Sequence, residues 1–190
     1  WIALYAGIAG GADIILVPEI PNEIEEVARV CDTRAEQLKF TIIVIAEGAK
    51  TAEGDLVVRE TIESSTDPIR LGGVGNVLAH QLKDMISSEI RTTILGHIQR
   101  GGAPTAFDRI LATRLGAYAA SMVARKEYGR MAAIQNSSLT SVTLEAVANK
   151  TRTVSLESMT VLSALSVGTS FGTTMMPKPL ELIYDGIKLI

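Results

Sequence analysis

The chain has 190 residues, of which 47% are hydrophobic but only 4% aromatic, and this suits an aliphatic core of buried parallel strands covered by helices. Its 18 Lys and Arg against 21 Asp and Glu give a formal net charge of -3, which provides no basic field to hold a nucleic acid. The single cysteine excludes an internal disulfide, and with two histidines it is too few for a zinc cage, so we expect the reducing cytoplasm. No apolar run approaches the ~20 residues of a membrane span, which argues against a membrane protein.

Strands and helices alternate along the predicted chain. Apolar segments rich in β-branched residues predict buried strands at residues 13–18, 40–47, 91–96 and 131–135. Helical features occur in residues 1–12, 23–30 (with Asn22 as the cap), 75–86 and 106–126. The last helix begins after Thr105, and Asp108 completes a pattern close to a capping box. We therefore expect an α/β fold with a parallel sheet of about four strands flanked by helices.

Residues 50–65 interrupt this alternation. The turn-forming run Thr-Ala-Glu-Gly-Asp precedes a short β-prone segment at residues 56–58, which predicts a β-hairpin excursion. Towards the C-terminus, a helix is predicted near residues 156–165. The sequence thus predicts one α/β domain over residues 1–150, with the hairpin inserted near residues 50–65, and a C-terminal helical tail over residues 151–190.

Each predicted strand is followed by a polar residue. These are Glu19, Glu47, His97 and Gln135, the last with Asn136 beside it. In open parallel sheets the ligand crevice lies beyond the carboxyl ends of the strands. We therefore expect these side chains to face one site.

Residues 96–102, Gly-His-Ile-Gln-Arg-Gly-Gly, carry the groups that bind a phosphate. Arg100 and the preceding Arg91 offer planar forks of charged donors, His97 adds a ring donor, and the glycine pair lets backbone amides approach closely. The helix that starts at Thr105 presents an amide end that favours anions. As residue types alone, these residues fit equally well a solvated loop with surface arginines and a glycine turn.

Residues 91–109, RTTILGHIQRGGAPTAFDR, resemble the characteristic motif of the 6-phosphofructokinase family without a gap. The flanking runs YAGIAGGADIILVPE and VIAEGAK also resemble that family, and the resemblance extends over residues 1–172. It implies the fructose 6-phosphate-binding, C-terminal portion of an enzyme of glycolysis. That enzyme transfers a phosphoryl group from ATP to the 1-hydroxyl of D-fructose 6-phosphate and gives fructose 1,6-bisphosphate.

The resemblance also implies roles for individual residues. Glu47 would accept hydrogen bonds from the sugar hydroxyls, and His97 and Arg100 would bind the sugar phosphate within one subunit. Arg91 would reach the 6-phosphate of a neighbouring subunit, which implies a homo-oligomer, in this family usually a tetramer. Asp108 would support the helix and loop rather than contact the substrate.

The resemblance places the phosphoryl-donor half of the enzyme before Trp1. The catalytic Asp and the residues that hold Mg²⁺ with ATP, or with pyrophosphate, are expected there, so the isolated chain is expected to be inactive. Residues 36–38, Glu-Gln-Leu, replace the basic residues of allosteric relatives, which argues against regulation by nucleotide diphosphates and favours the subgroup with pyrophosphate-using members. A pyrophosphate-dependent phosphofructokinase and a non-catalytic sugar-phosphate-binding or assembly module are therefore the alternatives.

Overall fold

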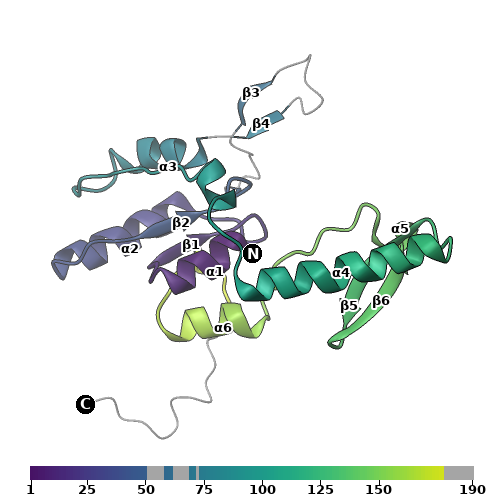
Figure 1. Ribbon diagram of the computed structural model, residues 1–190. Coiled ribbons are helices and arrows are strands. Elements are labelled where there is room, and N and C mark those ends of the chain that lie inside the picture. Colours follow the sequence, from purple (N-terminus) through teal and green to yellow (C-terminus); the bar gives the residue numbers. More distant parts are fainter. Residues whose placement is uncertain (51–57, 62–68, 72, 178–190) are drawn as a thin grey trace, which may run out of the picture. The chain divides into compact units, whose positions relative to one another are not determined.

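The computed structural model describes residues 1–50, 58–61, 69–71 and 73–177, and these form two compact units. Unit 1 comprises Trp1–Ile94 together with the segment that starts at Thr153, and unit 2 comprises Leu95–Arg152. The chain therefore leaves unit 1, builds unit 2 and then returns (Figure 1). The structure divides the chain differently from the predicted domain over residues 1–150 and tail over residues 151–190, because the returning segment completes the core of unit 1.

A pair of parallel strands forms the centre of unit 1. β1 (Ile14–Leu16) pairs with β2 (Ile43–Ile45), and Ile14 lies opposite Ile43. The other edge of β1 meets the returning segment, since the Ile15 amide donates to the Ser170 carbonyl at 2.9 Å and the Ser170 amide donates to the Asp13 carbonyl at 2.8 Å. The helices of this unit, together with this parallel pair, confirm the α/β class. They are α1 (Ile2–Ala9), α2 (Ile24–Glu36), α3 (Val74–Leu82) and α6 (Met159–Ser166).

The prediction of about four parallel strands is wrong in two places. Residues 91–96 form no strand. In unit 2, β5 (Arg130–Gln135) pairs with β6 (Ser138–Thr143) in antiparallel fashion. Asn136 and Ser137 between them have φ of +48° and +66°, and two residues with positive φ form the tight turn that joins neighbouring antiparallel strands. Because neither residue is a glycine, this turn carries only a weak signal in the sequence.

The predicted hairpin excursion is present, but it extends further along the chain. β3 (Val58–Thr61) pairs with β4 (Ile69–Leu71) in antiparallel fashion, with an irregular register between Val58 and Glu60. The turn residues and most of the β-prone run on which the prediction depended, residues 51–57, lie outside the described residues.

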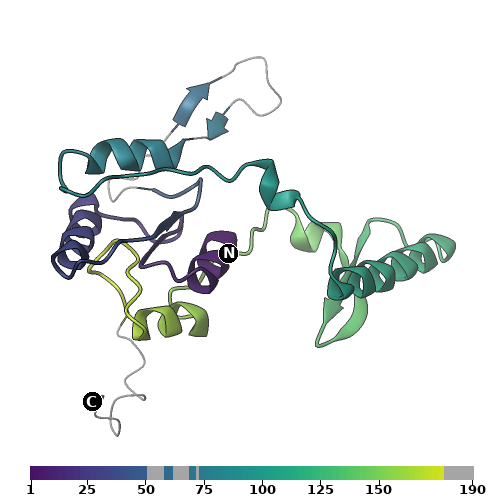
Figure 2. The same cartoon turned by 60° about the vertical axis from the view of Figure 1, so that its left-hand side comes forward.

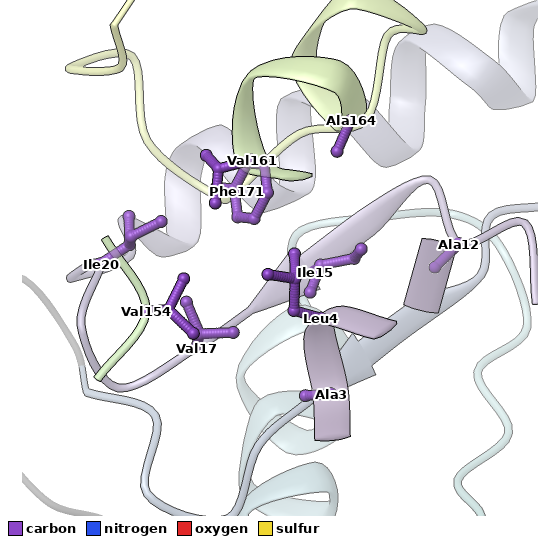
Figure 3. Packing of buried hydrophobic residues seen from close by; sticks show 10 residues of the cluster. All are labelled: Ala3, Leu4, Ala12, Ile15, Val17, Ile20, Val154, Val161, Ala164 and Phe171. Atoms are coloured by element: carbon purple, nitrogen blue, oxygen red, sulfur yellow. The ribbon is translucent and has the colours of Figure 1, made fainter. Parts of the chain in front are cut away.

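The first hydrophobic cluster lies on one side of β1 and joins the two ends of the chain. Ile15 and Val17 pack there with Leu4 of α1 and with residues of the return, namely Val154, Val161, Ala164 and Phe171 (Figure 3). At Gly172, φ is +72°, and a Cβ atom there would lie 2.6 Å from Leu16 Cδ2. Only glycine allows the backbone to pass so close to β1. The predicted helix near residues 156–165 is confirmed as α6, which belongs to this core.

The second cluster lies on the other side of β1. Ile14 and Leu16 pack there against residues of α2 and α3, including Val27, Cys31, Leu78 and Leu82. Burial raises the pKa of the Cys31 thiol, so the thiol stays protonated. Figure 2 shows α2 and α3 beside the strands. β1 is thus covered on both faces, which explains why its sequence is uniformly hydrophobic.

Polar side chains fix the ends of α2. Near its C-terminus, Arg34 forms an ion pair with Asp13 at 2.7 Å and donates to the Phe40 carbonyl at 3.1 Å. At the other end, the predicted Asn22 cap is wrong, because α2 has Glu23 as its N-cap and no side chain caps it. The buried Asn22 amide instead donates to the Lys50 carbonyl at 2.7 Å and ties the start of α2 to the segment after β2.

Unit 2 consists of the 3₁₀ turn η1 (His97–Arg100), the long helix α4 (Ala106–Ala124), the β5–β6 hairpin and the short helix α5 (Leu144–Val147). α4 packs against both strands of the hairpin. Among the described helices, none is both long enough and apolar enough to cross a membrane.

The returning segment gives the first testable prediction. Phe171→Ala removes a fully buried ring from the first cluster, and such truncations cost about 3–5 kcal/mol. We expect a large fall in the free energy of unfolding, measured by urea titration followed by circular dichroism. Met175→Ala is the control, because Met175 lies in the same segment but is 83% exposed. Equal stability of the two variants would show that the segment does not belong to the core.

Candidate functional site

The loops after the two parallel strands lie against each other. Glu47 and Gly48 form the turn after β2, and a Cβ atom at Gly48 would lie 3.3 Å from Cγ of Pro18, in the loop after β1. Glu47 is exposed. Glu19 accepts a hydrogen bond from the Val154 amide at 2.9 Å through Oε1, while its Oε2 is buried without a hydrogen-bond partner. The carboxylate of Glu47 is therefore the one at this edge that a ligand can reach.

Arg91 lies in the exposed segment that leads out of unit 1. Its Nε lies 3.0 Å from Oε1 of Glu89, and both side chains are largely exposed, at 84% and 74%. Solvent-exposed ion pairs of this kind contribute little, so the guanidinium can exchange Glu89 for a stronger anion at small cost. This pairing was not predicted from the sequence.

A cavity of about 340 Å³ lies beside Arg91 within unit 1. Ile43 and Ile45 of β2, Leu78 and Leu82 of α3, and residues 88–93 are among its lining. It lies next to β2 because residues 91–96 form no strand to pair with that edge. Hydrophobic side chains of β2 and α3 line one part of it, and polar residues such as Glu89, Arg91 and Thr92 line another. The sequence did not predict this cavity.

The chemical groups of the motif are placed by a single 3₁₀ turn. His97 and Arg100 are its first and last residues, and backbone bonds of 3.1 Å from Gln99 to Gly96 and from Gly101 to Ile98 close it. The Gln99 side-chain amide also donates to the Leu95 carbonyl. In a 3₁₀ helix, side chains three positions apart eclipse each other. His97 and Arg100 therefore project on the same side of the turn, both exposed, and can bind one anion together.

The turn continues through Gly101 and Gly102 into α4. Gly102 has a φ of +90°, which only glycine adopts readily, and no atom lies within 4 Å of the position of its Cβ. The backbone here is therefore open to close approach by a ligand. Thr105 then caps α4 in a complete capping box with Asp108, as predicted.

The capping box changes the predicted anion site at the start of α4. The Asp108 amide donates to Thr105 Oγ1 at 3.2 Å, and Asp108 Oδ2 accepts from the Thr105 hydroxyl at 2.7 Å and from its amide at 2.8 Å. Hydrogen bonds from the Thr105 hydroxyl, which has the larger effect, and from the Thr105 amide lower the pKa of the Asp108 carboxyl. The Asp108 carboxylate thus already places a negative charge at this helix end, which makes the end less favourable for a phosphate than the sequence predicts. The 3₁₀ turn is the better anion site.

The predicted site residues fall into two groups. Glu47 and Arg91 belong to unit 1, whereas His97 and Arg100 belong to unit 2, and the structure brings the second pair together. Gln135 and Asn136 lie at the β5–β6 turn rather than at the end of a parallel strand, so the reason for grouping them with the site does not hold. In the described part of the chain, no three His, Cys, Asp or Glu side chains cluster so as to hold a metal ion.

Comparisons with known proteins point to one family. A model of the Phosphofructokinase family matches residues 1–123. The ATP-dependent 6-phosphofructokinase 2 of Clostridium perfringens is 46% identical over 173 residues, which cover 90% of this chain and 47% of that protein. The pyrophosphate–fructose 6-phosphate 1-phosphotransferase of Amycolatopsis methanolica is 43% identical over 154 residues, which cover 81% of this chain and 45% of that protein.

A crystal structure of the pyrophosphate-dependent phosphofructokinase from Marinobacter aquaeolei has a similar fold, with a TM-score of 0.65 at 19% sequence identity. The match covers 95% of this chain and 47% of that one. The chain thus spans about half the length of the relatives it matches.

The capping box gives the second prediction. Thr105→Ala removes the side-chain cap, and losses of this kind cost about 0.5–2 kcal/mol. We expect faster hydrogen exchange at the amides of the first turn of α4, measured by NMR, with little change in the last turn. Lowering the pH is expected to reduce the protection of these amides, measured as exchange relative to the intrinsic rate at each pH. Since the folded pKa of Asp108 is depressed, its contribution is complete above about pH 4 and is lost as the pH falls through the folded pKa. Unchanged first-turn exchange in Thr105→Ala would contradict the assignment.

Proposed function

Because the chain belongs to the phosphofructokinase family, we propose that it supplies the acceptor site of a 6-phosphofructokinase. The enzyme transfers a phosphoryl group to the 1-hydroxyl of D-fructose 6-phosphate and gives fructose 1,6-bisphosphate, a step of glycolysis. The chain spans about half the length of its relatives, so the remaining half would complete the active enzyme. A cytoplasmic location is part of the proposal.

The observation that carries the proposal is the placement of His97 and Arg100 on one side of a single 3₁₀ turn. An imidazole N–H and a guanidinium that project together suit the three oxygens of a sugar phosphate, and the guanidinium offers a planar fork to two of them. The exposed Gly101 and Gly102 leave room beside them for the ligand. We assign the 6-phosphate of the acceptor to this turn.

Glu47 and Arg91 complete the proposed site from unit 1. The exposed Glu47 carboxylate, at the end of β2, would accept hydrogen bonds from the sugar hydroxyls. Arg91, whose partner Glu89 is itself exposed, would reach the 6-phosphate bound by another subunit. The proposal thus includes a homo-oligomer, as a tetramer, in which one subunit contributes Arg91 to the site of its neighbour.

The donor and its metal ion would be held by the half that this chain does not span. Mg²⁺ neutralises the charge of the transferred phosphoryl group when it is bound with the donor. The residues described here offer no carboxylate cluster for it, so we assign it no ligand in this chain. The role of His97, Arg100 and Glu47 is to fix the acceptor so that its 1-hydroxyl meets the donor in a productive orientation.

ATP is the proposed donor, and pyrophosphate is the second candidate. One relative at 46% identity is named as ATP-dependent, and another at 43% identity is named as pyrophosphate-using, so identity does not separate the two donors. The exposed residues 36–38 at the C-terminal end of α2 lack the basic residues expected in allosteric relatives, which favours the subgroup with pyrophosphate-using members. The acceptor assignment is the same for either donor.

The third prediction tests the acceptor site in a chimera that joins this chain to the part of the Clostridium perfringens relative that it does not match. His97→Ala and Arg100→Ala each remove a charge-assisted hydrogen bond worth about 1.5–3 kcal/mol. We therefore expect KM for fructose 6-phosphate to rise about 10- to 100-fold, with KM for the donor little changed. Steady-state kinetics with each substrate varied in turn measures this.

Arg29→Ala is the matched control, because Arg29 is an exposed arginine of α2 that pairs with Glu26 and lies outside the motif. A mixing experiment separates Arg91 from the other two residues. If Arg91 acts across an interface, mixed oligomers of Arg91→Ala and His97→Ala regain activity, because some sites receive both intact residues. If neither His97→Ala nor Arg100→Ala changes KM for fructose 6-phosphate, the acceptor assignment is wrong.

The fourth prediction concerns the donor, and it requires the natural protein at its full length. We expect turnover with ATP and fructose 6-phosphate, and at least tenfold lower kcat/KM with pyrophosphate, measured by the release of fructose 1,6-bisphosphate. The reverse preference would establish the pyrophosphate-dependent activity and leave the acceptor site unaffected. The 190-residue chain alone is expected to show no turnover with either donor.

A further inference from the structure

The 3₁₀ turn η1 receives no support from packing, because all of residues 95–102 are exposed. Short 3₁₀ segments have poorer hydrogen-bond geometry than α-helices. Gly96 and Gly101 flank the turn, and glycine loses more conformational freedom on folding than any other residue. The two backbone bonds that close the turn therefore need further support if His97 and Arg100 are to stay on one side of it.

Gln99 provides this support. Its side-chain Nε2 donates to the Leu95 carbonyl, four residues earlier, while its backbone amide donates to the Gly96 carbonyl at 3.1 Å. One residue thus holds the chain at two points, one before the flanking glycine and one at it. In the described stretch 95–102, the bond from Gln99 to Leu95 is the one hydrogen bond that a side chain makes. Both residues belong to unit 2.

Gln99 does not share the side of the turn on which the anion would bind. With three residues per turn, successive side chains of a 3₁₀ helix project about 120° apart. Gln99 follows His97 by two positions and precedes Arg100 by one, so its side chain projects away from the side that those two share. Its amide group already donates to the Leu95 carbonyl. Gln99 can therefore affect anion binding through His97 and Arg100 rather than by contact with the anion.

We propose that Gln99 is a positioning residue for the acceptor phosphate, whose bond to the Leu95 carbonyl holds the 3₁₀ turn in the form in which His97 and Arg100 bind one anion together. The inference rests on the proposed assignment of the 6-phosphate to this turn. Without the bond, only a fraction of the molecules has the turn formed, and the apparent affinity for the phosphate falls in proportion to that fraction. Saturating substrate draws the turn back into its binding form, so the maximal rate is retained.

The first experiment is steady-state kinetics of the natural protein at its full length. Gln99→Met keeps the length of the side chain, removes the donor and adds no charge. We expect KM for fructose 6-phosphate to rise about 3- to 10-fold, the effect of losing one neutral hydrogen bond, with kcat and KM for the donor little changed. Gln81→Met is the matched control, because Gln81 is an exposed glutamine of α3 outside the motif.

A double-mutant cycle distinguishes positioning from direct contact with the substrate. In an Arg100→Ala background the pair that Gln99 would align is already broken, so Gln99→Met is expected to change KM for fructose 6-phosphate by less than about twofold. If Gln99→Met has its full effect in that background, Gln99 contacts the substrate itself, and the proposal is overturned.

The second experiment needs neither substrate nor turnover. In the 190-residue chain we expect a nuclear Overhauser effect between the His97 ring protons and the Arg100 side-chain protons, measured by NMR. It should be weaker in Gln99→Met than in the wild-type chain or in Gln81→Met, while Tm stays the same in all three. An undiminished effect in Gln99→Met overturns the proposal, and so does a lowered Tm, because Gln99 would then support the fold rather than the site.

The two experiments separate failure of this inference from failure of the proposed function. If His97→Ala and Arg100→Ala raise KM for fructose 6-phosphate but Gln99→Met does not, the acceptor assignment holds and the role of Gln99 is wrong. If none of the three variants changes this KM, the acceptor assignment is wrong and the positioning role is overturned with it.

Discussion

The burial of β1 on both faces and at both edges is the constraint on which unit 1 depends. Ile14, Ile15 and Leu16 are all fully buried, so side chains must cover them from two directions. α2 and α3 provide one cover, and α1 with the returning segment provides the other. The backbone of β1 pairs with β2 at one edge and with Ser170 at the other. The loop that carries Glu47 has its position because β2 is paired in this way.

The sequence predicts those parts of the fold that depend on local patterns. The apolar runs of β1 and β2, the helices and the Thr105–Asp108 capping box all follow from neighbouring residues, and the structure agrees. The antiparallel pairing of β5 could not be predicted, because it depends on positive φ at Asn136 and Ser137, which have no glycine to reveal it. Asn22 was predicted to cap α2, but its side-chain amide donates to the Lys50 carbonyl instead. This contact could not be predicted, because Lys50 is distant in the sequence.

The candidate site shows the same division. His97 and Arg100 lie within one short stretch, so the sequence indicates that they are close, but the 3₁₀ turn that places them on one side was not predicted. Glu47 and Arg91 belong to the other unit, and their roles depend on resemblance to a family. At the start of α4, the Asp108 carboxylate accepts hydrogen bonds from the amide and the hydroxyl of Thr105. A negative charge therefore already lies where the sequence predicts a preference for anions.

The contact between the returning segment and β1 has a consequence for the order in which the chain folds. The Thr169 hydroxyl donates to the Ala12 carbonyl across 157 residues, so unit 1 cannot close during synthesis until the segment around Thr169 has left the ribosome. Unit 2, whose hairpin and helices are made by local contacts, is free to form earlier. Until Phe171 and Gly172 arrive, one face of β1 stays open to water and to other hydrophobic chains. Transiently exposed hydrophobic surface of this kind makes a nascent protein prone to aggregation.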